Sequence, residues 1–415
     1  MKTWLEHNLL KLNLTDTMDQ PDGFTRLSFS PEEWEARDAF IQIAKEMDLT
    51  IREDEAGNVI ARWIPGSPAE EKPAIALGSH VDTVTNGGGY DGVAGVLCGL
   101  GTVYQLKKEG FTPDRPVEVI CFASEESARF GVSTIGSKAM SGMLDTEALA
   151  EVPDKDGVTI KQAMEERGLN YDESPKAERD AGDLSSFVEL HIEQGTRIEK
   201  ARGEVGAVTA IACPIRLNID IFGKAGHTGT TPMADRQDAL VSAAELISFI
   251  YNRALAFNEE NDTPLVATAS TISNEPNVMN VIPGKVTVGV DIRSVSDELK
   301  EKMAEEIRKK TAEIEETFRA TINIQTLVNN PSIFLDESVH KDLTRAAEQA
   351  GLNNFTLESG AGHDVMNMAR KWPSGLVFIP CKDGLSHHPE EHASLDDLEK
   401  GVKLLAAYIK NKAGD

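Results

Sequence analysis

The sequence predicts an α/β protein whose main domain is interrupted by a smaller α+β domain. The chain has 415 residues, more than the roughly 250–300 at which a single hydrophobic core usually stops growing. Strand-like apolar runs alternate with helix-like stretches in the first half and again near the C-terminus, as in α/β layer folds. Between these parts the pattern becomes βαββαβ, the order of a ferredoxin-like unit. The predicted domains are therefore residues 1–212 with 328–415, and residues 213–327.

The first part of the chain predicts one capped helix followed by buried strands. Residues 30–33, Ser-Pro-Glu-Glu, combine an N-cap, a proline at the first helical position and acidic first-turn residues, and apolar positions recur up to Met47. Apolar runs bounded by turns predict strands at residues 58–63, 74–77, 117–122 and 187–190. Two further helices are predicted at residues 92–108 and 159–167.

The middle of the chain shows the alternation of strands that have one solvated face. Residues 215–221 alternate between apolar and polar side chains with a period of two. The other elements predicted for this domain are helices at 233–257 and 297–319 and strands at 265–273, 285–293 and 321–327. After Pro331 the α/β pattern returns, with a helix at 337–350, a strand at 375–379 and a last helix from Leu395.

The charge and cysteine patterns argue against several classes of protein. The chain has 68 Asp and Glu residues against 42 Lys and Arg residues, a net charge of −26. Because such an anion repels phosphate backbones and anionic lipids, no nucleic-acid or membrane partner is expected. The four scattered cysteines form no C-x-x-C pair, which argues against a disulfide framework or a thiolate zinc site. Without an 18-residue apolar run or an apolar leader, a cytoplasmic protein is predicted.

Two polar motifs near the first apolar strands are candidates for metal binding. His80 and Asp82 follow a strand directly, where an imidazole can bind a metal while the carboxylate orients its ring. The alternative is a turn with a capping aspartate. Residues 87–92, Gly-Gly-Gly-Tyr-Asp-Gly, contain a formal G-x-G-x-x-G, but a dinucleotide site would follow the first strand directly and Asp91 would repel a pyrophosphate. The glycines are therefore interpreted as freeing the backbone to direct Asp91 at a metal.

Three later motifs complete the candidate set. Glu125 and Glu126 close a strand, where they suit a metal ligand beside a general base, although paired acids also favour a helix N-terminus. The five predicted ligands are His80, Asp91, Glu126, His191 and His387. Three imidazoles and two carboxylates suit Zn²⁺, Mn²⁺, Co²⁺ or Ni²⁺. The histidines at 388 and 392 are predicted to be surface residues at a helix start.

In order and spacing, these motifs resemble the hydantoinase/carbamoylase family of dinuclear metal amidohydrolases. That family includes N-carbamoyl-L-amino-acid hydrolase, β-ureidopropionase, allantoate amidohydrolase and ureidoglycolate amidohydrolase. The His-Ile-Glu-Gln-Gly run at 191–195 and the G-x-S-H-x-P-E pattern at 384–390 are the most specific parts of the resemblance, which covers nearly the whole chain. It implies a metallopeptidase-like catalytic domain, two divalent ions, and hydrolysis of a ureido or carbamoyl C–N bond with release of ammonia and CO₂.

The resemblance also implies roles for single residues. Asp91 would bridge the ions, His80 and His387 would complete one site, and Glu126 and His191 would serve the other. Glu125 would be the general base and acid. The inserted domain would be a dimerisation and lid domain. The implied substrate-binding residues are Gln194, His227, Asn280, Arg293, Gly362 and His363.

Three questions stay open at this point. Arg293 could instead pair with Asp291 on its own strand or with acids of the following helix. The residues near 129–133 and 378–381 look closer to the ureidoglycolate branch, whereas those at 227–232 and 359–364 look closer to the allantoate branch. A dinuclear metallopeptidase or N-acyl-amino-acid deacylase, and a non-catalytic binding protein of the same fold, are the alternative functions.

Overall fold

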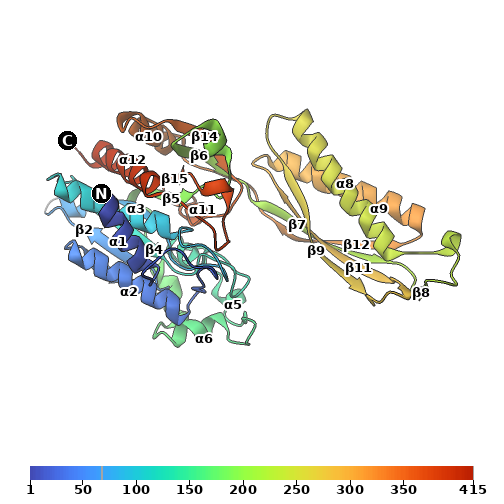
Figure 1. The fold of residues 1–415 in the computed structure, drawn as a ribbon. Coiled ribbons are helices and arrows are strands. Elements are labelled where there is room, and N and C mark those ends of the chain that lie inside the picture. The colour runs from blue at the N-terminus through green and yellow to red at the C-terminus, as the bar shows by residue number, and fades with distance from the viewer. Residues whose placement is uncertain (67–68, 415) are drawn as a thin grey trace. The chain divides into compact units, whose positions relative to one another are not determined.

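The computed structural model describes residues 1–66 and 69–414, and it divides into two compact units. Unit 1 contains residues 1–209, 335–359 and 363 onward, and unit 2 contains residues 210–334 and 360–362. The chain therefore enters unit 2 three residues before the predicted boundary at 213 and leaves it seven residues after 327. Figure 1 shows both units in chain colours.

Unit 1 is built on a mixed sheet, which confirms the predicted α/β class. The sheet has nine strands in the order β1-β2-β4-β3-β5-β15-β6-β13, with β14 paired to β6. Strands β3, β4, β5 and β15 run parallel to their neighbours within this set, so their carboxyl ends meet at one edge. The strands are β1 (Thr50–Glu53), β2 (Val59–Trp63), β3 (Ala74–His80), β4 (Val117–Phe122), β5 (Leu184–Ile192), β6 (Val205–Ile211), β13 (Ile333–Phe334), β14 (Asn354–Ser359) and β15 (Ser374–Ile379).

Helices pack against this sheet and bury its apolar strands. The long helices are α1 (Lys2–Leu12), α2 (Pro31–Glu46), α3 (Val93–Lys108), α10 (Glu337–Gln349) and α12 (Leu395–Ala413). The shorter elements are α4 (Ile135–Met140), α5 (Thr146–Leu149), α6 (Ile160–Glu165), α7 (Arg197–Ala201), α11 (Val365–Met368), η1 (Ala69–Glu71), η2 (Tyr171–Ala177) and η4 (Lys382–Gly384). Helix α3 lies so close to β5 that a Cβ at Gly95 would overlap the carbonyl oxygen of Leu190. The four cysteines are buried, and no disulfide joins them in the described part of the chain.

Local capping chemistry explains where two of the predicted helices begin. The Ser30 side chain accepts a hydrogen bond from the Glu33 N–H, which confirms the predicted start of α2. Thr159 forms a capping box with Gln162 at the start of α6. Helix α1 and strands β6 and β14 were not predicted. The buried face of α1 consists of widely spaced leucines among polar residues, which is a weak periodic signal.

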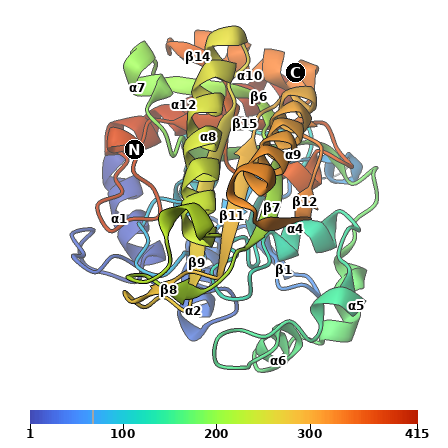
Figure 2. The ribbon, with the colours of Figure 1, turned by 90° about the vertical axis from the view of Figure 1, so that its right-hand side faces the viewer.

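Unit 2 has the predicted βαββαβ order of long elements. Its antiparallel sheet has the strand order β12-β7-β11-β9, and helices α8 and α9 run side by side over one face of that sheet (Figure 2). Along β11, buried valines and isoleucine alternate with half-exposed residues, as a sheet covered on one face requires. The elements are β7 (Pro214–Phe222), α8 (Ala239–Glu260), β9 (Val266–Glu275), β11 (Lys285–Arg293), α9 (Asp297–Phe318) and β12 (Thr321–Asn329), with β8 (Gly226–His227), η3 (Met233–Asp235) and β10 (Val281–Ile282).

Helix α8 begins later than the sequence predicted. The expected start at Met233 is wrong, because residues 233–235 form a separate 3₁₀ turn and the Asp238 side chain caps the helix at Leu240 and Val241. Among the described residues, α8 is the one helix whose length and composition would allow it to cross a membrane. Its buried residues recur every three or four positions and pack on the sheet of unit 2, so length and composition are weak evidence for insertion.

Candidate metal centre

The five predicted ligands come from strand ends and adjoining loops of unit 1. His80 and His191 lie at the carboxyl ends of the parallel strands β3 and β5. Asp91 precedes α3, Glu126 follows β4, and His387 lies in the loop before α12. Because the parallel strands end at the same edge of the sheet, side chains distant in sequence converge there.

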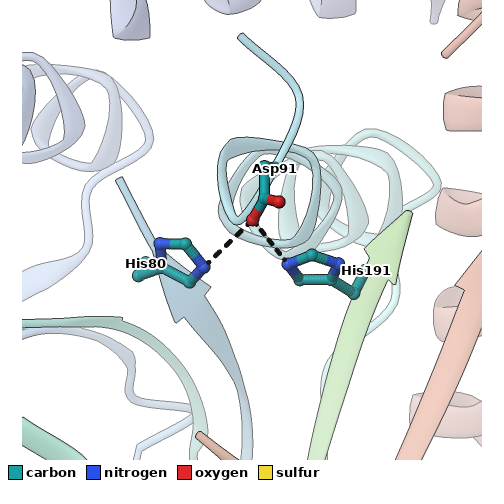
Figure 3. Close-up of side chains that lie close together, drawn as sticks. All are labelled: His80, Asp91 and His191. Atoms are coloured by element: carbon teal, nitrogen blue, oxygen red, sulfur yellow. Dashed lines mark ion pairs between the residues drawn. The ribbon is translucent and has the colours of Figure 1, made fainter. Parts of the chain in front are cut away.

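The first group of ligand atoms consists of His80, Asp91 and His191. The Oδ1 atom of Asp91 lies 3.4 Å from His80 Nε2 and 3.1 Å from His191 Nε2 (Figure 3). All three side chains are buried, and their ligand atoms lie within 4.8 Å of one another. Two imidazoles and one carboxylate at this spacing could hold one divalent ion.

The second group consists of Asp91, Glu126 and His387. His387 Nε2 lies 3.1 Å from Glu126 Oε1 and 3.4 Å from Asp91 Oδ2. The ligand atoms of this group also lie within 4.8 Å of one another. Asp91 therefore belongs to both groups, with one carboxylate oxygen facing each. This grouping differs from the division implied by the resemblance, which had placed His80 with His387.

Hydrogen bonds on the far side of each ring leave Nε2 available to a metal. His80 Nδ1 lies 3.0 Å from the Asp82 carbonyl oxygen, and His191 Nδ1 lies 2.9 Å from that of Ile192. Since a carbonyl oxygen can only accept, each Nδ1 carries a proton, and in the neutral imidazole this tautomer leaves the lone pair on Nε2. The Gly92 N–H donates to His191 Nε2 at 3.1 Å, a hydrogen bond that shows the lone pair and that a bound ion would replace. The donor set fits a divalent metal ion.

Asp82 links His80 to the paired glutamates. Its Oδ1 accepts from the Glu125 N–H at 3.1 Å and lies 3.4 Å from His80 Nδ1, and its Oδ2 accepts from the Glu126 N–H at 2.9 Å. The Ser28 hydroxyl donates to Oδ2 at 2.9 Å. One buried carboxylate thus holds an imidazole in orientation and fixes the backbone of the two glutamates.

The charges at the centre depend strongly on burial and on the neighbouring groups. Burial by itself would raise the pKa of Asp91, but His191, His387 and His80 hold that pKa well below its usual range. Burial raises the pKa of Glu125 well above its usual range. His80 lowers this pKa, whereas the carboxylates of Glu126 and Asp364 raise it further. Glu125 Oε2 lies 3.8 Å from His80 Nε2. Glu125 is therefore a buried carboxyl that takes up a proton readily beside the ligand groups.

The glycine after Asp91 allows its loop to pass close to His80. Gly92 has φ +64°, and a Cβ at this position would overlap the His80 ring. A side chain here would therefore meet both an unfavourable backbone conformation and a ring that cannot move freely. This geometry agrees with the interpretation that the glycine-rich run allows the backbone to orient the Asp91 side chain toward a metal ion.

Gln194 and His363 of the predicted substrate-binding set lie at this centre. Gln194 Nε2 donates to Asp91 Oδ2 at 2.7 Å and to Ser386 Oγ at 3.1 Å. His363 is buried with its ring centroid 4.6 Å from that of His191, and its Nε2 lies 3.1 Å from Ser359 Oγ. Burial lowers the pKa of His363 well below its usual value, with the neighbouring His191 acting in the same direction. Gly362 groups with unit 2.

The three remaining predicted residues do not meet within unit 2. His227 is exposed on the small β8–β10 ladder, and the Thr228 N–H donates to the Asn280 carbonyl at 3.3 Å, so the loops of these two residues are neighbours. Arg293 ends β11, whose opposite end at Lys285 follows β10. Eight residue steps along β11 span roughly 26 Å at about 3.3 Å each. One chain therefore cannot bring all three side chains to one small molecule.

Arg293 uses the alternative partner considered from the sequence. Its Nε donates to Asp291 Oδ1 at 2.8 Å, and its Nη1 donates to the Gly360 carbonyl at 2.7 Å. Arg216 Nε also donates to Asp291, at 2.9 Å. The two arginines therefore share one carboxylate on the surface of the sheet.

Two residues of the centre received no role from the sequence. Ser386 Oγ donates to Asp91 Oδ2 at 2.8 Å, and the buried Glu391 accepts from the Asp91 N–H at 2.9 Å. Both residues lie close to His387 in the same sequence motif, and this proximity was the one signal in the sequence that could have identified them. His388 and His392 are exposed, as predicted, but the predicted helix start there is wrong, because the Ser394 side chain caps α12 at Leu395.

Comparisons with known proteins show similarity over nearly the whole chain. Residues 76–411 match Peptidase family M20/M25/M40. An N-carbamoyl-L-amino-acid amidohydrolase of Paenarthrobacter aurescens is 37% identical over 94% of this chain and 93% of its own length. A ureidoglycolate hydrolase of Oryza sativa is 37% identical over 95% of this chain and 81% of its own length. The crystal structure of an amidase of the hydantoinase/carbamoylase family from Burkholderia multivorans aligns with TM-score 0.89 and 29% identity, covering 100% of this chain and 98% of that one.

The fold and the site thus define a hydrolase of the M20/M25/M40 class. Within that class the chain belongs to the hydantoinase/carbamoylase family, which confirms the resemblance drawn from the motifs.

Proposed function

We propose that this protein hydrolyses the ureido or carbamoyl C–N bond of a small carboxylate substrate and releases ammonia and CO₂. The observation that carries the proposal is the carboxylate of Asp91, shared by two ligand groups with the buried Glu125 beside them. Relatives named for carbamoyl amino acids, ureidoglycolate and allantoate support this bond type. The cytoplasmic location stays a prediction.

The donor set supports two divalent ions, Zn²⁺, Mn²⁺, Co²⁺ or Ni²⁺. His80, Asp91 and His191 would hold one ion, and Asp91, Glu126 and His387 the other. Bound ions of this kind lower the pKa of water and polarise a carbonyl group.

The chain's own residues supply the proton transfer and the alignment. Glu125 would accept a proton from the attacking water and return it to the leaving nitrogen, for which a carboxyl of raised pKa is suited. Asp82 holds the backbone of Glu125 and the ring of His80 in fixed positions relative to each other. Gln194, which now donates to Asp91, carries a side-chain amide that can also bind a polar substrate group.

Ammonia release tests the function directly. The purified protein, supplied with each of the four ions in turn, is incubated with N-carbamoyl-L-amino acids, allantoate and ureidoglycolate, and in parallel with dipeptides and N-acetyl-amino acids. Ammonia from at least one ureido compound, at a higher kcat/KM than any peptide or acyl substrate, is expected. Preferred cleavage of a dipeptide or N-acyl compound would favour the peptidase or deacylase alternative, and no turnover with any ion would favour a binding protein.

We also propose that Arg293 binds the substrate carboxylate. Replacing Arg293 with lysine keeps the charge but loses the planar fork of donors, so kcat/KM should fall by about 10- to 100-fold, the worth of one charge-assisted hydrogen bond. The matched control is Arg216→Lys, because Arg216 shares Asp291 with Arg293. Steady-state kinetics with a substrate and its carboxamide analogue provide the readout. An equal loss in both variants, or on both substrates, would show that Arg293 only supports the sheet.

A homodimer would allow His227 and Arg293 to bind the same substrate although they are far apart within one chain. We propose that one subunit supplies His227 and Asn280 and the other supplies Arg293 to the same substrate. Co-expressed H227A and R293A chains should then regain activity, since each mixed dimer contains one intact site. Random pairing in a two-fold dimer predicts about a quarter of the wild-type rate. Activity no higher than the mean of the two single variants would contradict the shared site.

A further inference from the structure

Glu391 lies under the candidate metal centre and connects two of its ligand segments. This carboxylate is 4% exposed and accepts hydrogen bonds at both oxygens. Its Oε1 accepts from the Tyr90 and Asp91 N–H groups, both at 2.9 Å. Its Oε2 accepts from the His387 N–H at 3.3 Å and lies 3.1 Å from Ser386 Oγ, whose one hydroxyl proton is shared with Asp91 Oδ2. One side chain therefore joins two loops that are roughly 300 residues apart in the sequence.

The packing around Glu391 leaves little freedom to either loop. A Cβ at Gly88 would overlap the Glu391 carboxyl group, so the glycine-rich loop passes directly over it. The Tyr90 hydroxyl also lies 3.2 Å from His392 Nδ1, a second contact between the same two segments. The backbone positions of Asp91 and His387 are thus set by a common support.

The two ligand groups depend on this support to different extents. His80 and His191 extend from the buried strands β3 and β5, which hold them without help from Glu391. His387 extends from a loop, its side chain is 47% exposed, and it has φ +56°. Its position relative to Asp91 therefore relies on contacts between the two segments. Ser386 Oγ donates to the Asp91 side chain, and Glu391 accepts from the backbone N–H groups of Asp91 and His387.

We propose that Glu391 is a positioning residue that sets the distance between Asp91 and His387. It thereby determines the affinity of the second ligand group for its metal ion. The proposal rests on the metal centre of the proposed function but not on the identity of its substrate. The partners of metal-binding side chains typically change metal affinity by about 10- to 100-fold.

Stepwise metal titration of the metal-free protein tests this role without turnover. Isothermal titration with Co²⁺, followed in parallel by the cobalt absorption spectrum, gives the Kd of the first and of the second ion. In Glu391→Gln one oxygen becomes an NH₂ group that cannot accept a hydrogen bond, so the contacts to one of the two loops are lost in either orientation of the amide. The ratio of the second Kd to the first is expected to rise about tenfold or more.

Two further variants make the outcome decisive. Glu391→Asp keeps the charge, but its side chain is too short to reach both loops, so the same ratio of Kd values should rise. This variant also provides the test if the glutamine variant fails to fold. Glu390→Gln removes the adjacent exposed carboxylate and should leave the ratio unchanged. A change of less than about threefold in the ratio for the folded Glu391 variants would overturn the proposal, whatever happens to their thermal stability. Because no substrate is present, failure of the proposed reaction would leave this result intact.

Discussion

Replacing Glu125 with glutamine is expected to lower kcat by about 10²- to 10⁴-fold, the usual contribution of a general acid–base group. The amide occupies the same space but cannot accept and return a proton. Glu125 is buried 3.8 Å from His80 Nε2 yet lies outside both ligand groups, so the metal content should stay at the wild-type value. Steady-state ammonia release and elemental analysis of the same preparation measure the two quantities.

The adjacent glutamate supplies the matched control. Glu126 lies 3.1 Å from His387 Nε2 and belongs to the second ligand group. Glu126→Gln should therefore lose one ion per chain, whereas Glu125→Gln keeps both. If the glutamine variant at 125 turned over at nearly the wild-type rate, or if it lost metal while the variant at 126 did not, the assigned roles would be wrong.

Removal of divalent ions is expected to abolish turnover while the fold of unit 1 persists. The strands β3 and β5, which carry His80 and His191, lie within the buried apolar core of unit 1, so the fold does not depend on the ligand side chains alone. Dialysis against a chelator, followed by ammonia-release assays and circular dichroism, separates these effects. Mn²⁺, Co²⁺, Ni²⁺ or Zn²⁺ should restore activity to different degrees, because the site accepts borderline ions.

A calcium addition serves as the control for this experiment. Ca²⁺ prefers six to eight oxygen ligands and suits a site with three imidazoles poorly, so it should not restore turnover. Full activity in a sample shown by elemental analysis to contain no divalent metal would refute the proposed chemistry. Collapse of the circular dichroism signal on chelation would instead assign the ions a structural role.

The sequence located the candidate metal centre because the chemistry of each motif is local to that motif. A histidine, aspartate or glutamate directly after an apolar strand can be recognised without knowing the neighbouring strand, and all five predicted ligands meet in the structure. The order of long elements in unit 2 was also predictable, since β11 and β7 alternate with a period of two. The start of α8 was not, because a single capping aspartate outweighed the apolar residues before it.

What the sequence by itself determined is therefore the class of fold and the family, whereas the five candidate ligands, which the structure brings together, and the candidate base stay predictions. Only the tertiary structure decided how the ligands are grouped, since that depends on strand order and on the orientation of each ring around Asp91. It likewise decided that Glu391 supports two ligand loops, and that His227 and Arg293 lie at opposite ends of β11. Motifs report which side chains stand at strand ends, but distances between segments hundreds of residues apart are set by packing, which no single segment encodes.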